Sequence, residues 1–349
     1  MRKRISFLAA AFVLASVMLP LGSAAGPSFS WHLTPTGSTA RLRGLSAVSA
    51  QVAWASGSLG TVLRTTDAGQ TWQQVGPPGT SALQFRDVEA FDADHAAILS
   101  IGTGSDSRVY VTSDGGQHWA LTFVNDHPDA FYDCMAFFDR KHGLAVSDPV
   151  DGRFRIIVTS DGGRTWRIAS GEMPPALPGE FGFAASGECL VTASGRQAWF
   201  GTGGAAQARV FHSSDRGEDW QVRATPIHSG PTAGIFALAF RDRRHGFAVG
   251  GDFTMPSLAP DALALTSDGG NNWALISDAP NEYRSGASWM TGKVAIVVGP
   301  TGSDVSLDQG RSWQRFDTGS FDTVDCPRGH VCWASGEQGR AAYLVDPRK

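Results

Sequence analysis

Short apolar runs recur along the chain, and polar, glycine-containing turns separate each run from the next. Seven of them share one form: VAWASG at 52–57, AAILSIG at 96–102, HGLAVSD at 142–148, QAWFGTG at 197–203, HGFAVGG at 245–251, KVAIVVG at 293–299 and VCWASG at 331–336. Short apolar runs that are bounded by turn residues and lack a helical period predict buried β-strands.

An eight-residue motif follows six of these runs: TTDAGQTW at 65–72, TSDGGQHW at 112–119, TSDGGRTW at 159–166, SSDRGEDW at 213–220, TSDGGNNW at 266–273 and SLDQGRSW at 306–313. The aspartates Asp67, Asp114, Asp161, Asp215, Asp268 and Asp308 are 47, 47, 54, 53 and 40 positions apart. This spacing is the length of one four-stranded propeller blade.

The two ends of the chain are expected to complete one blade together. The seventh run is followed by one more strand-like segment, 339–344, and the chain ends before any octapeptide, whereas an isolated Trp31 stands 41 residues before Trp72. We therefore expect the N-terminal segment to supply the outer strand of the last blade, residues 321–345, because this closure removes a sheet edge. The predicted fold is all-β: a seven-bladed β-propeller of four-stranded antiparallel blades.

The first 25 residues are typical of a secretory signal peptide. Three basic residues follow Met1, an apolar stretch covers 5–21, and small residues occupy 22–25. A retained membrane anchor is the less favoured alternative, because Pro20 and the small residues follow so closely. We expect a single propeller domain over 26–349, about 46 residues for each of seven blades, with no membrane span after cleavage. The expected location is periplasmic or secreted.

Composition narrows the possible ligands. Charged residues make up 18% of the chain, the net charge is −4, and no basic run occurs beyond the first four positions, which argues against nucleic acid as a partner. No glycine-rich nucleotide-binding motif is present, so no cofactor is expected. His95, His142 and His245 occupy the same hairpin in three different blades, which propeller geometry keeps apart, so no metal site is expected.

We expect the protein to be a monomer.

The four cysteines suggest one disulfide and leave a second open. Cys326 and Cys332 flank a five-residue turn and are predicted to pair. Cys134 and Cys189 occupy equivalent positions on neighbouring inner strands, where a disulfide is possible but could exceed the usual reach. A catalytic thiol is less favoured, because neither a Cys-X-X-Cys motif nor a basic neighbour singles one out.

Strand direction predicts where a binding site would lie. Numbering the strands of a blade from the channel outwards, each octapeptide occupies the turn between the third and fourth strands. The opposite face receives the long insertions 169–187, 223–234 and 250–261 and the starts of the inner strands. Long loops on a rigid scaffold are where binding usually resides.

Charged residues are expected to converge at the channel mouth on that opposite face. The candidates for ligand binding are Arg43, Arg86, Asp87, Asp133, Asp148, Glu188, Asp252, Arg284 and Asp304, with Asp325 beside them. The ring is either a ligand site or a solvated set of compensating salt bridges. Mixed charge favours a polar or zwitterionic small ligand, or the charged tail of a protein partner.

The octapeptides resemble the Asp box, also called the bacterial neuraminidase repeat, [ST]-x-D-x-G-x-x-W. In that motif aspartate and the hydroxyl hydrogen-bond within a tight turn, glycine supplies positive φ and tryptophan anchors the next strand. The resemblance implies that the six aspartates are structural rather than catalytic.

Together with the HGLAV and HGFAVGG runs, the blades resemble the photosystem II stability/assembly-factor propellers and their bacterial relatives along nearly the whole mature chain. This resemblance implies a non-catalytic propeller that binds or helps to assemble a protein or polar ligand. The alternative is a sialidase-like glycoside hydrolase, in which Arg43, Arg86 and Arg284 would imitate an arginine triad near Tyr132 or Tyr283. Sialidases, however, have six blades, and this chain lacks their Phe-Arg-Ile-Pro motif.

Overall fold

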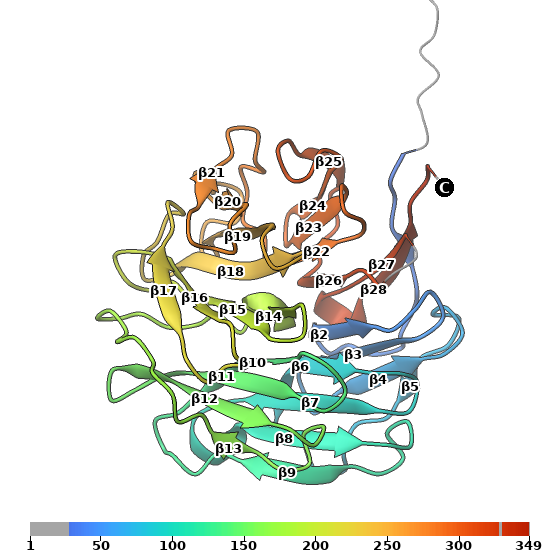
Figure 1. The fold of residues 1–349 in the computed structure, drawn as a ribbon. Helices are drawn as coiled ribbons and strands as arrows, with labels where there is room; N and C mark the ends of the chain where they lie inside the picture. The colour runs from blue at the N-terminus through green and yellow to red at the C-terminus, as the bar shows by residue number, and fades with distance from the viewer. Residues whose placement is uncertain (1–27, 328–329, 349) are drawn as a thin grey trace, which may run out of the picture.

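Seven four-stranded antiparallel sheets form a ring in the computed structural model, which describes residues 28–327 and 330–348 (Figure 1). The predicted seven-bladed β-propeller is therefore confirmed. The expected signal peptide lies outside the described residues. Within the described part of the chain, no helix is long and apolar enough to cross a membrane.

The first four blades follow the chain from the channel outwards. Blade 1 contains β2 (Leu42–Ala47), β3 (Ala53–Gly57), β4 (Val62–Thr65) and β5 (Gln73–Gln74). Blade 2 contains β6 (Gln84–Ala90), β7 (Ala96–Ile101), β8 (Arg108–Thr112) and β9 (Ala120–Val124). Blade 3 contains β10 (Tyr132–Phe137), β11 (Gly143–Val150), β12 (Arg153–Thr159) and β13 (Arg167–Ile168). Blade 4 contains β14 (Leu190–Ala193), β15 (Gln197–Gly201), β16 (Arg209–Ser213) and β17 (Gln221–Ala224).

The last three blades include the closing one. Blade 5 contains β18 (Ala233–Phe240), β19 (Gly246–Asp252), β20 (Leu263–Thr266) and β21 (Ala274–Leu275). Blade 6 contains β22 (Gly286–Trp289), β23 (Ala295–Gly299), β24 (Gly302–Ser306) and β25 (Gln314–Asp317). Blade 7 contains β26 (Thr323–Asp325), β27 (Val331–Ser335), β28 (Ala341–Val345) and β1 (His32–Leu33). Three short 3₁₀ helices, η1 (Gly104–Asp106), η2 (Gly187–Cys189) and η3 (Glu337–Gly339), lie in the connections.

The N-terminal strand closes the ring, as predicted. β1 pairs antiparallel with β28, His32 opposite Tyr343 and Leu33 opposite Ala342, and the blue N-terminal segment lies beside the red C-terminal strands in Figure 1. Trp31 stands one residue before β1 and is only 9% exposed. Its indole N–H donates to Ser303 Oγ at 3.0 Å, which ties the closing strand to blade 6. The outer edge of β28 is thereby covered.

The apolar core lies between adjacent blades rather than within them. One such cluster combines Trp54 and Val62 of blade 1 with Phe85 and Ile98 of blade 2. Tryptophans of the octapeptides join these layers: the Trp119 indole N–H donates to the Val75 carbonyl at 2.6 Å. Each blade is therefore held by the packing of its neighbours.

The octapeptides form the turns between the third and fourth strands. In blade 3, Thr159 Oγ1 donates to Asp161 Oδ1 at 2.9 Å, and Asp161 accepts from the N–H and the hydroxyl of Thr165 at 2.9 and 2.6 Å. Gly163 supplies φ +80°. The same carboxylate-to-backbone bond recurs at Asp67, Asp114, Asp215, Asp268 and Asp308. Each aspartate thus accepts a hydrogen bond from a backbone N–H of its own turn, which stabilises the turn.

Candidate functional site

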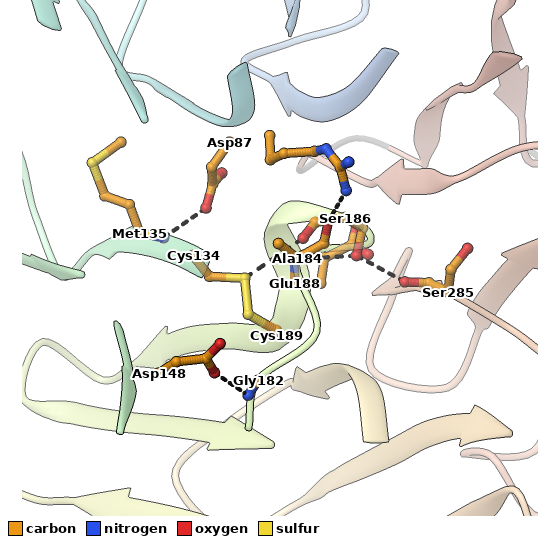
Figure 2. The surroundings of a disulfide bond; sticks show 11 residues. Asp87, Cys134, Met135, Asp148, Gly182, Ala184, Ser186, Glu188, Cys189 and Ser285 are labelled. Carbon is orange, nitrogen blue, oxygen red and sulfur yellow. Dashed lines mark hydrogen bonds between the residues drawn. A yellow bond between two sulfur atoms is a disulfide. The ribbon is translucent and has the colours of Figure 1, made fainter. Parts of the chain in front are cut away.

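A segment of the connection between blades 3 and 4 enters the central channel and divides it. We call residues 181–189 the plug; they include η2. The plug is covalently attached to blade 3, because Cys189 forms a disulfide with Cys134 of β10 (Figure 2). The pairing that the sequence left open is thus present. The Gly182 N–H also donates to Asp148 Oδ1 at 2.8 Å.

Other hydrogen bonds hold the plug to the far side of the channel. Ser186 Oγ donates to the Ser285 carbonyl at 2.7 Å, next to blade 6 (Figure 2). Glu188 accepts from the Thr323 hydroxyl at 2.7 Å and from the Val324 N–H at 3.2 Å, both in blade 7. The plug therefore bridges blades on opposite sides of the ring and separates two cavities.

The first cavity opens on the face opposite the octapeptides, and we call it the mouth cavity. It measures about 590 Å³. Four inner strands each contain a β-bulge at the same point, where the register shifts. The bulged residues are Arg43, Arg86, Asp133 and Phe236, and all four line the cavity. A bulge re-aims the extra side chain, so one residue from each of four blades points into the mouth.

Two of the guanidinium groups in the mouth cavity lack a close carboxylate partner. Arg41 binds Asp322 through two bonds of 2.8 and 2.6 Å. Arg43 is 3.9 Å from that occupied carboxylate, and its buried Nε has no hydrogen-bond partner among the residues that the structure describes. Arg86 donates to the Ala184 carbonyl at 2.5 Å and to Gln84 Oε1 at 3.0 Å, and no carboxylate of the described residues lies within 4.0 Å of it.

Burial and the neighbouring arginine charges lower the pKa of Arg86 to about 10. Burial likewise lowers the pKa of Arg43. Arg86 nevertheless stays protonated at neutral pH, so the mouth cavity holds a positive charge with no carboxylate of the described residues within 4.0 Å. A cavity of this kind favours an anionic ligand group.

Aromatic side chains form another wall of the mouth cavity: Phe131, Phe181, Phe183, Phe236, Phe253 and Tyr283. Phe183 of the plug stacks on Phe236 with ring centroids 3.9 Å apart. Phe253 lies on the insertion 250–261 and is 48% exposed at the rim. An apolar wall beside a few convergent polar groups is typical of a binding pocket.

A carboxyl pair, Asp133 and Asp148, lies in the same cavity. Burial, followed by the charge of Asp148, raises the pKa of Asp133 well above its usual value. Burial raises the pKa of Asp148 to about 6, against the opposing effect of the Gly182 N–H. Two carboxyls this close retain a proton between them.

The second cavity opens on the octapeptide face, and we call it the acidic cavity. It measures about 350 Å³ and its lining includes Asp87, Glu89, Glu188 and Asp325 but no basic residue. Burial raises the pKa of Asp87 and of Glu188 to about 8. Asp87 and Glu188, which were predicted to lie at the mouth, therefore lie beyond the plug. Alternate strand residues point to different sides, and the bulge gives the mouth position to Arg86 rather than Asp87.

Arg284 and Asp304 were also predicted to face the mouth, and the structure places them elsewhere. Arg284 is fully buried and donates to Asp304 Oδ2 at 2.7 Å and to Thr301 Oγ1 at 2.9 Å. The reason is that β22 begins only at Gly286, so Arg284 belongs to the preceding connection. Asp252 is the last residue of β19; it accepts hydrogen bonds from Thr254 and does not line the cavity.

The sialidase-like arrangement predicted as the alternative is therefore incomplete. Arg284 is absent from the mouth cavity, and Tyr132 packs between blades against Phe123. Tyr283 does line the cavity, but it is 6% exposed, and burial raises its pKa, which disfavours a nucleophilic phenolate.

A larger hollow of about 1040 Å³ lies on the octapeptide face between blades 2 and 3. Two of its charged groups already have partners: Arg140 binds Asp92 at 2.7 Å, and His118 binds Asp114 at 2.6 Å.

The remaining sequence predictions concern metals and the C-terminal cysteines. Across residues 28–327 and 330–348, no group of three or more His, Cys, Asp or Glu side chains is placed to hold a metal ion. Cys326 and Cys332 form a disulfide.

Sequence reasoning missed several residues of the mouth cavity, among them Arg41, Asp322, Glu337 and the phenylalanines of the plug. Arg41 stands two positions before Arg43, so the strand period could have indicated it. Most of the plug, residues 181–187, lies inside the insertion 169–187 that was singled out as a long loop. No local signal shows that this insertion turns inwards.

The fold defines the chain as a seven-bladed β-propeller, and comparisons with known proteins identify similar structures. One is YCF48 bound to a D1 peptide, with a TM-score of 0.67, 16% identity, and coverage of 92% of this chain and 100% of that one. YCF48 from Cyanidioschyzon merolae gives a TM-score of 0.65, 14% identity, and coverage of 91% and 99%.

A GH74 enzyme from Niastella koreensis has a TM-score of 0.61 and 13% identity over 89% of this chain, which spans only 53% of that enzyme. No protein-family model matches the sequence, and no curated protein matches it either. Identities this low show a shared fold.

Proposed function

We propose that this chain is an exported, non-catalytic binding propeller that holds a carboxylate-bearing segment of another polypeptide in the mouth cavity. The observation that carries the proposal is Arg86, a half-buried guanidinium whose only hydrogen-bond acceptors among the described residues are the neutral Ala184 carbonyl and Gln84. Beside it, Arg43 has a buried Nε without a partner. A ligand carboxylate would supply the acceptors that both groups lack.

The rest of the cavity supports a polypeptide ligand. Its volume of about 590 Å³ exceeds that of a single small anion, and the phenylalanine wall provides apolar area for side chains. YCF48, which shares the fold, has a structure with a bound peptide. Two disulfides support export, because such bonds persist mainly in oxidising compartments.

A peptide panel tests the binding function. Fluorescein-labelled decapeptides of random sequence, each made with a free C-terminal carboxylate and as the amide, are titrated with the protein by fluorescence anisotropy. We expect the carboxylate forms of the binding peptides to bind about tenfold or more tightly than the amides, and Arg86→Ala to abolish that preference. Arg164→Ala is the matched control, because Arg164 is exposed on the octapeptide face.

Two outcomes would contradict the binding function. One is that no peptide of the panel binds even at about millimolar protein, which corresponds to a binding free energy weaker than about −4 kcal/mol. The other is that Arg86→Ala, shown to be folded by its melting temperature, retains the full preference for the carboxylate.

Export has its own test. The full chain is expressed in a bacterial host, and the mature N-terminus is read from the periplasmic or culture fraction. A start near Ala25 or Gly26 supports export, and an intact Met1 in the cytosolic fraction contradicts it.

One observation favours a second candidate function, glycoside hydrolysis: a carboxyl pair with raised pKa values lines the mouth cavity. Against it, Asp133 and Asp148 share a proton, whereas the two carboxyls of retaining glycosidases stand about 5–5.5 Å apart to flank the sugar. Release of reducing sugar from xyloglucan, or of sialic acid from a sialoside, that Asp148→Asn abolishes would establish the enzyme.

A further inference from the structure

The two carboxyl groups in the mouth cavity, Asp133 and Asp148, receive no hydrogen bond from Arg43 or Arg86. Asp133 occupies the bulge of β10 and is 2% exposed, and no N–H or O–H donor of residues 28–327 and 330–348 bonds its Oδ2. Asp148, near the end of β11, is half-buried, and its Oδ1 accepts from the Gly182 N–H. When both carboxyls are ionised, the buried Asp133 Oδ2 has no donor among these residues, which is costly unless a shared proton or a cation supplies one.

No cation of the protein neutralises this pair. Within the described part of the chain, no Lys, Arg or His nitrogen lies within 4.0 Å of either carboxylate. The charged and titratable groups that face the pair across the cavity are Arg41, Arg43, Arg86, Tyr283, Asp322 and Glu337. Of these, Arg86 affects the pair only at a distance, and Arg41 is occupied by Asp322.

We propose that Asp133 and Asp148 form a subsite for a primary ammonium group, the lysine side chain of the polypeptide whose carboxylate lies at Arg43 and Arg86. This inference rests on the proposed binding function and names the second charge that its ligand must carry. The mouth cavity would then recognise a chain segment with a lysine near a carboxylate, with the phenylalanine wall against the stem of the lysine.

The shape of the subsite selects a compact cation. Gly182 of the plug lies against Asp133: a Cβ at this glycine would stand 3.0 Å from Asp133 Oδ2. Because Gly182 covers part of the pair, we expect an ammonium, a compact point charge on a thin stem, to fit better than a planar guanidinium with five donors in a fixed fork. A divalent metal ion would need more oxygen ligands than the two carboxyls supply.

Binding of an ammonium replaces the proton that the empty pair holds. The bound lysine favours the ionised carboxyls, so the pair releases its proton when the peptide binds. Because burial raises the pKa of Asp148 to about 6 and that of Asp133 well above its usual value, the affinity for lysine peptides is lower at acid pH and rises as the pH passes the pKa values of the pair. A peptide without the ammonium group shows no such rise from this pair.

The experiment uses the tightest carboxylate peptide of the panel, with lysine, Nε-acetyl-lysine or norleucine placed in turn at each of its last positions. At about pH 8 both carboxyls of the pair are ionised in the complex. At this pH we expect the best lysine peptide to bind about tenfold more tightly than its acetylated form. Asp148→Asn should remove this difference without weakening the acetylated peptide. Asp252→Asn is the matched control, because Asp252 is on the same face but outside the cavity.

Gly182→Ala provides a second, independent variant. Its φ lies outside the left-handed region, so alanine is compatible with the backbone, while its Cβ narrows the approach to Asp133. We expect it to lower the affinity for the lysine peptide selectively.

Two results would overturn the ammonium subsite alone: equal affinities for the lysine and acetyl-lysine peptides at every position, or a lysine preference that survives in Asp148→Asn. If free lysine displaces the peptide when both are at the same concentration, the ammonium group need not come from a polypeptide, and that part of the proposal would be wrong. Failure of every peptide to bind would instead contradict the proposed function.

Discussion

Replacement of Trp31 by alanine tests how the ring is closed. The indole is 9% exposed and packs against Phe321 with ring centroids 5.3 Å apart. Its N–H donates to Ser303 Oγ, a residue of blade 6. Truncating a buried tryptophan to alanine typically costs about 3–5 kcal/mol, because the cavity left behind collapses only in part.

The expected effect is large enough to measure by thermal unfolding. With an unfolding entropy of about 2.1 cal/mol/K per residue, a loss of about 3–5 kcal/mol in a chain of this length lowers the melting temperature by about 4–7 °C. Circular dichroism at a strand wavelength would follow the transition. Trp31→Phe should retain most of the packing and lose only the hydrogen bond, about 1 kcal/mol.

Leu33→Ala is the matched control for this prediction. Leu33 lies in β1 but is 58% exposed, so its truncation should change the free energy of unfolding by no more than about 0.5 kcal/mol. A melting temperature of Trp31→Ala equal to that of the wild type would refute the closure of the ring by this segment.

Three further predictions concern the octapeptide turns, the plug and the acidic cavity. Asp161→Ala removes the acceptor of the Thr165 N–H and should cost about 1–3 kcal/mol in urea unfolding; a loss of peptide binding at unchanged stability would contradict its structural role. Serine at both Cys134 and Cys189 releases the plug and should weaken peptide binding in calorimetry, whereas unchanged affinity would show that the tether is unnecessary. Because burial raises the pKa of Asp87 to about 8, the folded state keeps a proton that the unfolded chain releases near pH 4, and stability declines as the pH rises from about 4 to 8. Asp87→Asn should reduce this decline, and an equally steep dependence in the variant would contradict the assignment.

The blades were predictable because their signals are local. Glycine and aspartate at fixed offsets specify a turn within eight residues, and the turn sets the strands on either side. The spacing of Asp67, Asp114 and Asp161 therefore carries the repeat directly. The isolated Trp31 also indicated the closing strand, because it precedes the first blade while the last blade lacks an outer strand.

The candidate site was predictable only where a blade keeps the common register. Arg43, Arg86 and Asp133 stand at the same point of their inner strands and reach the mouth. Arg284 stands at the apparent equivalent in the sequence, but its strand starts two residues later, and the side chain turns to Asp304 instead. The strand pattern alone does not locate that start.

The plug was not predictable, since long-range contacts determine its course. The cysteines of its disulfide are 55 residues apart, and Arg86 and Ala184, which hydrogen-bond beside it, are 98 apart. Nothing within the insertion distinguishes a segment that enters the channel from one that stays on the surface.

The repeated bulge makes the mouth cavity a modular surface. Because the bulged residue is the extra one in its strand, its side chain can change without altering the residues that pair across the ladder. The mouth cavity therefore has four positions that can vary independently of the strand pairing, one in each of four blades: Arg43, Arg86, Asp133 and Phe236. We therefore expect single substitutions at these positions to change which ligands the cavity prefers, while the octapeptide turns on the other face continue to maintain the fold.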